Sequence, residues 1–136
     1  MADFIHREDA EGQQRFEELL TNRFPAISAQ IGEVERGLLH LEMGVFARAT
    51  CAAIDNRNLQ EVVAHLVFVD ELFHDAPRTL ENAIYVSYLE NVFLGRDDER
   101  YRSARSGLSG RLAAALVSLE EHWKNIAEWN RKRYPR

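Results

Sequence analysis

Four polar side chains interrupt the apolar faces of the helices that the sequence predicts: Glu42, Asp70, Ser87 and Asn91. A carboxylate that is removed from water needs a partner or a shifted pKa, because uncompensated burial is costly. Two buried carboxylates near a histidine, such as His40 or His65, could perform acid–base chemistry in a pocket between helices. The structural alternative is that Glu42 or Asp70 pairs with an arginine or caps a neighbouring helix.

Other spacings that could support chemistry are weaker. Glu71 and His74 form an E-x-x-H step, which places a carboxylate and an imidazole on one helix face. Di-iron carboxylate bundles use two such steps and further carboxylates, and this chain has a single step. It also lacks the glycine-rich phosphate loops and the nucleophile motifs. The sequence therefore predicts no metal, no cofactor and no catalytic residue, which favours a protein that is not an enzyme.

Charge is sorted by position along the chain. Residues 58–99 carry nine acidic side chains against two arginines, whereas residues 100–136 carry nine basic side chains against three glutamates. The whole chain of 136 residues has a net charge of −5. Such opposed blocks indicate either a fold that neutralises itself or an acidic face for a basic partner. The acidic middle argues against nucleic acid as the main partner.

Helical periodicity dominates the sequence, without the alternation or turn pairs that are typical of hairpins. Residues 59–74 and 77–94 are apolar around most of their circumference, which predicts that these two helices lie at the centre. Asn58 is the expected N-cap of the first one. An apolar stripe on the last helix includes Trp123 as a core residue. The predicted helices cover residues 8–23, 38–55, 59–74, 77–94 and a segment that begins between 98 and 109 and ends near 130, with a weaker element at 26–37.

These elements predict an all-α fold, a single compact domain of five to six mostly antiparallel helices with two central, largely buried helices. The domain is expected to span residues 1–136, with frayed ends at 1–7 and 131–136. The lone Cys51 fits a reducing compartment. Because the sequence shows neither a secretory h-region nor an apolar stretch of membrane length, we expect a cytoplasmic protein with no membrane partner.

Three stretches carry a resemblance to a known family: HLEMGVFARAT at 40–50, LQEVVAHLVFVDELF at 59–73 and ENAIYVSYLENVF at 81–93. Together with the Phe24-Pro25 pair and the step from Ser87 to Asn91, they resemble a family of small all-helical bacterial proteins of unknown function. The resemblance covers residues 16–95 and implies a helical fold, a bacterial origin and no established activity. A small, acidic, helical chain is also similar to immunity proteins, which neutralise toxins delivered between bacteria.

The leading hypothesis is a non-catalytic protein-binding module, and more narrowly an immunity protein that occludes a basic toxin domain through an acidic face. The alternative is a small-ligand-binding or enzymatic protein that uses Glu42 and Asp70 in an interhelical pocket. A third hypothesis is a homodimer in which the acidic block of one copy meets the basic last helix of another. The residues predicted to contact the partner are Glu61, Glu71, Asp75, Asp97, Asp98 and Glu99.

Overall fold

The computed structural model describes residues 2–134, with side chains from residue 10 onward, and every regular element in this range is helical. α1 (Ala2–Arg23) ends at Phe24, because Pro25 lacks the N–H that would continue the hydrogen bonding. Pro25 instead starts the short helix α2 (Pro25–Ser28). The chain then runs through turns to residue 38, so the element predicted at 26–37 is helical only near its start.

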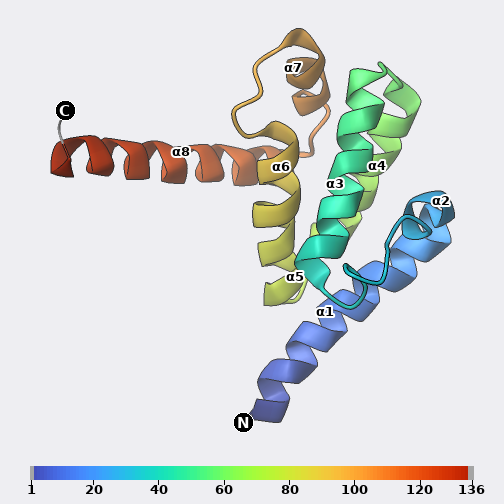
Figure 1. Cartoon of the computed structure of the whole chain (residues 1–136). Helices are drawn as coiled ribbons and strands as arrows, with labels where there is room; N and C mark the ends of the chain where they lie inside the picture. Colours follow the sequence, from blue (N-terminus) through green and yellow to red (C-terminus); the bar gives the residue numbers. More distant parts are fainter. Residues whose placement is uncertain (1, 135–136) are drawn as a thin grey trace.

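α3 (Leu39–Asp55) and α4 (Leu59–Phe73) are joined by a tight turn, so they pack side by side in opposite directions (Figure 1). The turn contains Arg57 in a left-handed conformation at φ 57°. Asn58 caps α4, since its side-chain oxygen accepts a hydrogen bond from the backbone N–H of Glu61 at 3.2 Å. The helices predicted at 38–55 and 59–74 and the Asn58 cap are confirmed.

A continuous helical segment follows, made of α5 (Arg78–Ala83), the π-helix η1 (Ile84–Leu89) and α6 (Glu90–Phe93). π-Helical turns are rare and occur frequently at functional sites. The segment packs against α1 and α3, and its side chains Leu80, Ile84 and Tyr88 are fully buried. It corresponds to the helix predicted at 77–94, and its central position is confirmed.

The other central helix is α3, which corrects the expectation that it is the 59–74 segment. α3 buries Phe46 and Thr50 completely. α4 is buried on one face only and exposes Leu59, Val63 and Val67 on the other. The apolar circumference of α4 is wider than the surface that its neighbours cover, and composition alone does not show how much of a helix is covered.

Aromatic rings form the middle of the core. The ring centroid of Phe46 lies 4.9 Å from that of His65, 5.3 Å from Phe68 and 5.4 Å from Tyr88. Phe16 of α1 adds an edge-to-face contact at 6.4 Å. Aromatic pairs at such separations contribute about 0.5–1.5 kcal/mol beyond their buried area. This cluster joins α1, α3, α4 and η1.

The last predicted helix is divided into α7 (Glu99–Arg105) and α8 (Gly110–Arg133). Each begins at a side-chain cap, Asp98 for α7 and Ser109 for α8. The first half of α8 packs on η1 and α6 and buries Leu112 and Leu119. Its second half projects away from the other helices (Figure 1).

The chain remains helical close to both ends of the described range. Residues 2–7 and 131–133, which were expected to be frayed, belong to α1 and α8. Residues 1, 135 and 136 of the predicted frayed ends lie outside the described residues. Among the helices of the described chain, none combines the length and the apolar character that crossing a membrane requires.

Candidate functional site

Glu42, predicted to be a buried carboxylate, is fully buried in the first turn of α3. The side-chain amide of Gln13 lies 3.1 and 3.3 Å from its two carboxylate oxygens, and the backbone N–H of Gly37 donates to it at 3.1 Å. The start of a helix also favours a negative charge. Gly37 has φ 84°, a left-handed conformation that suits glycine. Glu42 therefore connects α1 and the turn before α3 to α3 itself.

Asp70 is not buried, which corrects the prediction, because its position on α4 faces the start of α8 and leaves 30% of its side chain exposed. The Ser109 hydroxyl donates to Asp70 Oδ1 at 2.6 Å, and Arg111 lies 3.4 Å from both carboxylate oxygens. Ser109 also accepts from the backbone N–H of Leu112 at 3.2 Å. Asp70 thus holds the capped end of α8 on α4, in agreement with the structural alternative.

Of the other two polar residues, Ser87 is buried as predicted and Asn91 is exposed. Ser87 Oγ lies 2.7 Å from Nδ1 of His40. The side-chain amide of Asn91 instead turns back along its own helix and donates to the backbone carbonyl of Ser87 at 2.8 Å. Glu42 and Asp70 have different partners on different helices. The described residues therefore do not place these two carboxylates in one pocket.

A buried hydrogen-bonded chain that sequence reasoning missed runs from the core to the surface. The Tyr88 hydroxyl lies 2.9 Å from Thr50 Oγ1, which lies 2.9 Å from Nδ1 of His65. Nε2 of His65 lies 3.0 Å from Oε1 of the partly exposed Glu61. We assign every proton toward the carboxylate: Tyr88 donates to Thr50, Thr50 to His65, and His65 to Glu61.

This chain has the carboxylate–imidazole–hydroxyl order with which hydrolases activate a nucleophile. Thr50 is fully buried, so its hydroxyl does not face a substrate in this structure. A fully satisfied buried network favours a single arrangement of the core, here that of α3, α4 and η1. The sequence pattern that could have predicted this hydrogen-bonded chain is a threonine, a histidine and a tyrosine at core-facing positions of three helices. Only His65 was noted, as a general candidate for acid–base chemistry.

Burial shifts the two titratable groups inside the chain toward their neutral forms. Desolvation lowers the pKa of His65, and the hydrogen bond and charge of Glu61 offset this only in part. Desolvation also raises the pKa of Tyr88, and its hydrogen bond with Thr50 offsets this only in part. Both side chains are therefore neutral at pH 7, which agrees with the proton assignment.

His65 should make the folded protein less stable as the solution becomes more acidic. Its pKa is about 6.5 in the unfolded chain and lower in the native state, so the unfolded chain binds the proton first. The contribution is fully present above that value and is lost as the pH falls below it. Urea unfolding at pH 7.5 and 5.5 should show this loss, and His65→Gln should reduce it. An equal pH dependence in both proteins would contradict the assignment.

The acidic residues predicted to bind a partner are separated on α4. Glu61 is engaged by His65, whereas Glu71 pairs with Arg23 of α1 near the other end of the helix. Ten residues of α-helix separate these carboxylates by roughly 15 Å. They therefore do not form one contact patch on this helix.

Of the other four predicted acids, two are paired with arginines of the same chain. Asp75 lies 3.3 Å from His74 and Asp97 lies 3.6 Å from Arg102. Asp98 caps α7 and lies 3.5 Å from Arg100. Glu99 is exposed and forms no ion pair with the described residues. Of the two interpretations of the charge blocks, self-neutralisation by an arginine thus applies to three of the six predicted acids, Glu71, Asp97 and Asp98.

An exposed apolar row lies on the outer face of α4. Leu59, Val63 and Val67 are 69%, 59% and 51% exposed, and their four-residue spacing places them side by side. Beside Leu59, a hollow of about 280 Å³ opens between α4 and α7, with Glu99 and Arg100 in its lining. We call these five residues the α4–α7 surface. Contiguous exposed apolar side chains with a polar rim are typical of interaction sites.

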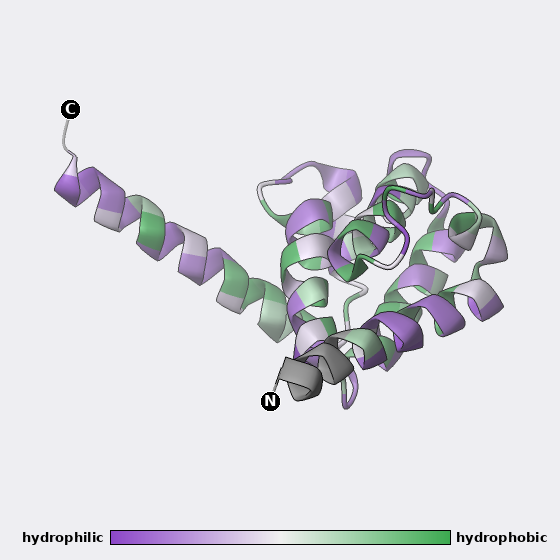
Figure 2. Cartoon of the chain, turned by 60° about the horizontal axis from the view of Figure 1, so that its bottom comes forward, coloured by the Kyte–Doolittle hydropathy of each residue, from purple (hydrophilic) through white to green (hydrophobic). Residues whose placement is uncertain are grey.

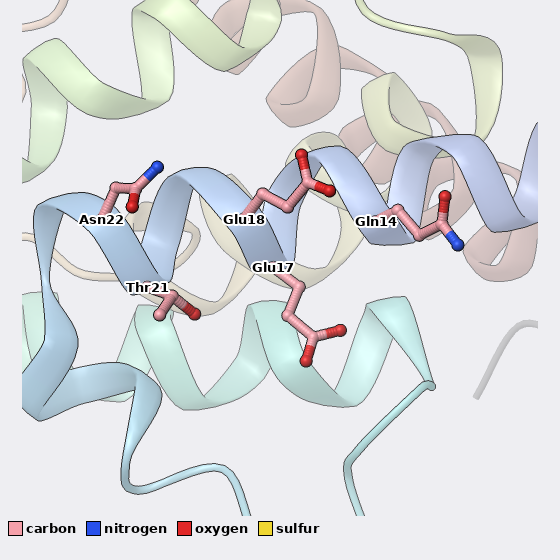
Figure 3. Close-up of a pocket in the computed structure, with 5 residues that line it drawn as sticks. All are labelled: Gln14, Glu17, Glu18, Thr21 and Asn22. Atoms are coloured by element: carbon pink, nitrogen blue, oxygen red, sulfur yellow. The ribbon is translucent and has the colours of Figure 1, made fainter.

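A hollow of about 550 Å³ on α1 lacks these features. Its lining residues Gln14, Glu17, Glu18, Thr21 and Asn22 come from one helix, and their side chains point in different directions (Figure 3). Glu17 is paired with Arg36 at 3.1 Å. In the part of the chain that the structure describes, no group of three or more His, Cys, Asp or Glu side chains could hold a metal ion.

Comparison with known families identifies the family of this chain. Residues 17–124 match the family described as "Domain of unknown function (DUF7674)". The chain belongs to the DUF7674 family. This confirms the resemblance to an uncharacterised all-helical family. No curated protein and no solved structure matches the chain. The DUF7674 region contains both the buried polar chain and the α4–α7 surface, whereas α8 after Lys124 lies beyond it.

Proposed function

We propose that this DUF7674 protein is a non-catalytic binding module that docks a partner protein on the α4–α7 surface. The observation that carries the proposal is the row of Leu59, Val63 and Val67, which leaves three aliphatic side chains in water. The opposite face of the same helix is packed into the core. A partner that covers the row removes apolar area from water, at about 25 cal/mol for each Å².

The partner that we infer is a basic bacterial toxin domain, which the protein neutralises by occluding it. The net charge of −5 and the unpaired Glu99 at the rim of the surface favour a basic partner. Glu71 is already paired with Arg23 and must change partners before it can contribute. We therefore expect the apolar row to supply most of the affinity and the charges to speed encounter.

Val63→Arg is expected to weaken binding to a purified basic toxin domain from the same genome by about 30-fold or more. The arginine would displace a central apolar contact, and hot-spot residues contribute about 2 kcal/mol or more. It would also repel a basic partner. Isothermal titration calorimetry measures the effect, and Val86→Arg is the matched control because Val86 is an exposed valine on another element.

Two results would count against the proposal in different ways. Equal affinities for Val63→Arg and Val86→Arg would exclude the α4–α7 surface as the docking site. Failure of the wild-type protein to bind the toxin domain would exclude that partner. Circular dichroism of both variants establishes that the helical fold is retained.

A further inference from the structure

The projecting half of α8 carries an apolar face that the rest of the described chain leaves uncovered. The stripe that buries Leu112 and Leu119 continues along the helix as Trp123, Ile126 and Trp129. These residues belong to the second half of α8, which stands away from the other helices in Figures 1 and 2. Trp123 is 42% and Trp129 is 55% exposed, which corrects the prediction that Trp123 is a core residue. Trp123 was predicted to be buried because the apolar stripe is continuous along α8. The helices that pack on α8 cover only its first half, however.

We call residues 120–133 the α8 arm. The arm is tied to α7 at its first residue, because Arg105 of α7 donates to both carboxylate oxygens of Glu120 at 2.8 and 2.5 Å. Isolated helices shorter than about 12–15 residues are marginal in water, because most helical stability comes from packing of the apolar face. An arm of this length therefore gains stability from a partner along its stripe.

The order of charges along the arm indicates what that partner is. Its first half carries Glu120, Glu121 and Lys124, a net charge of −1, whereas its second half carries Glu128, Arg131, Lys132 and Arg133, a net charge of +2. A second arm that runs in the opposite direction brings the acidic start of each copy beside the basic end of the other. A parallel arrangement would place like charges together. The arm is thus complementary to itself only when it is reversed.

We propose that the α8 arm is a dimerisation element that pairs in antiparallel orientation with the α8 arm of a second copy. In this dimer Trp123, Ile126 and Trp129 of the two copies cover one another, and Glu121 of each copy lies near Lys132 of the other. The contact differs from a homodimer in which the acidic 58–99 block meets the basic last helix. An anionic membrane is a poorer match, because three glutamates on the arm oppose its four basic side chains.

The size of the interface predicts a weak dimer. Four tryptophans that bury about 150–250 Å² each give an area below the roughly 1,200 Å² of stable complexes. We therefore expect a dissociation constant in the micromolar range. Sedimentation equilibrium between about 1 and 300 μM brackets that range. The same titration can be followed by fluorescence, because both tryptophans of the chain lie on the arm and should shift to the blue when they are covered.

Ile126→Glu and Trp129→Glu are each expected to raise the dissociation constant at least tenfold. Both place a charge on the covered face without touching the core of the monomer. Val117→Glu is the matched control, since Val117 is an exposed residue of the same helix that lies away from the stripe. Circular dichroism at low concentration separates loss of dimer from loss of fold.

A charge exchange tests the orientation. Glu121→Lys and Lys132→Glu should each weaken the dimer about three- to tenfold, because each creates two like-charge contacts between the copies. The combined variant should recover most of the wild-type affinity. In a parallel dimer Glu121 lies beside Glu121 of the other copy, and Lys132 beside Lys132. The combined variant would therefore not recover the wild-type affinity.

Three outcomes would overturn the proposal. The first is a monomer throughout the concentration range, and the second is a dimer that Ile126→Glu and Trp129→Glu leave unchanged. The third is a monomer whose tryptophan emission shifts only with vesicles of phosphatidylcholine and phosphatidylserine, which would identify the arm as a membrane contact. None of these results affects the toxin-binding test, because Val63 lies on α4 and the arm is part of α8.

Discussion

Replacing Phe46 with alanine is expected to lower the free energy of unfolding by about 3–5 kcal/mol, the cost typical of removing a buried phenylalanine ring. Phe46 is fully buried, and its ring contacts Phe68, Tyr88 and His65. The lost ring removes contact from α4 and η1, and also from Phe16 of α1. Because α3 lies between these elements, its backbone has little freedom to collapse into the cavity.

Urea denaturation followed by far-ultraviolet circular dichroism measures this loss. Val63→Ala is the control, because Val63 is mostly exposed and a surface change away from packed features usually stays within about 0.5 kcal/mol. Phe46→Leu should fall between the two, since it refills part of the volume. A loss below about 1 kcal/mol for Phe46→Ala would show that Phe46 is not at the centre of the core.

Thr50→Val is expected to cost about 2–4 kcal/mol, although the two side chains have nearly the same shape. The valine leaves the Tyr88 hydroxyl without its acceptor and Nδ1 of His65 without its donor. Each buried polar group that loses its partner costs about 1–3 kcal/mol. In this hydrogen-bonded chain, Thr50 bonds to two other buried side chains, His65 and Tyr88. Removing its hydroxyl is therefore expected to cost more than removing the hydroxyl of Tyr88 or the carboxylate of Glu61.

A double-mutant cycle with Tyr88→Phe tests the mechanism. Tyr88→Phe alone should cost about 0.5–1.5 kcal/mol, because Thr50 keeps its bond to His65. Added to Thr50→Val, it removes the unpaired hydroxyl, so the double variant should be more stable than the sum of the two losses by about 1 kcal/mol or more. Additive losses would indicate that the Thr50–Tyr88 contact contributes nothing, and that the cost of Thr50→Val has another origin.

The helices that sequence reasoning placed well are those with strong local signals. Asn58 caps α4 as predicted, and α1 ends just before Pro25, where the helix predicted at 8–23 also ends. Both effects depend on atoms within one turn of the residue. A single last helix was predicted, with its start left open between residues 98 and 109. The structure has two helices there, because Asp98 caps α7 and Ser109 caps α8. Both residues are good N-caps, and the sequence alone did not show that each of them starts a helix.

The candidate sites were predicted less well, because polar partners come from distant segments. Glu42 was recognised as buried, but its donor Gln13 lies 29 residues away. Asp70 was placed inside although Ser109 and Arg111 hold it at the edge of the fold. The acidic residues looked like a single block in the chain. Their pairing with arginines of α1 and α7 became visible only in three dimensions.

By itself, the sequence determined that this chain is all-helical and where most of its helices lie along the chain, because periodicity and caps act between neighbouring residues. Only the tertiary structure decided which apolar faces are covered. Leu59, Val63 and Trp123 belong to stripes as apolar as those of the core, yet the described helices leave 42% or more of each residue exposed. Coverage depends on the number and placement of the surrounding helices, and these follow from contacts between segments that are far apart in the sequence.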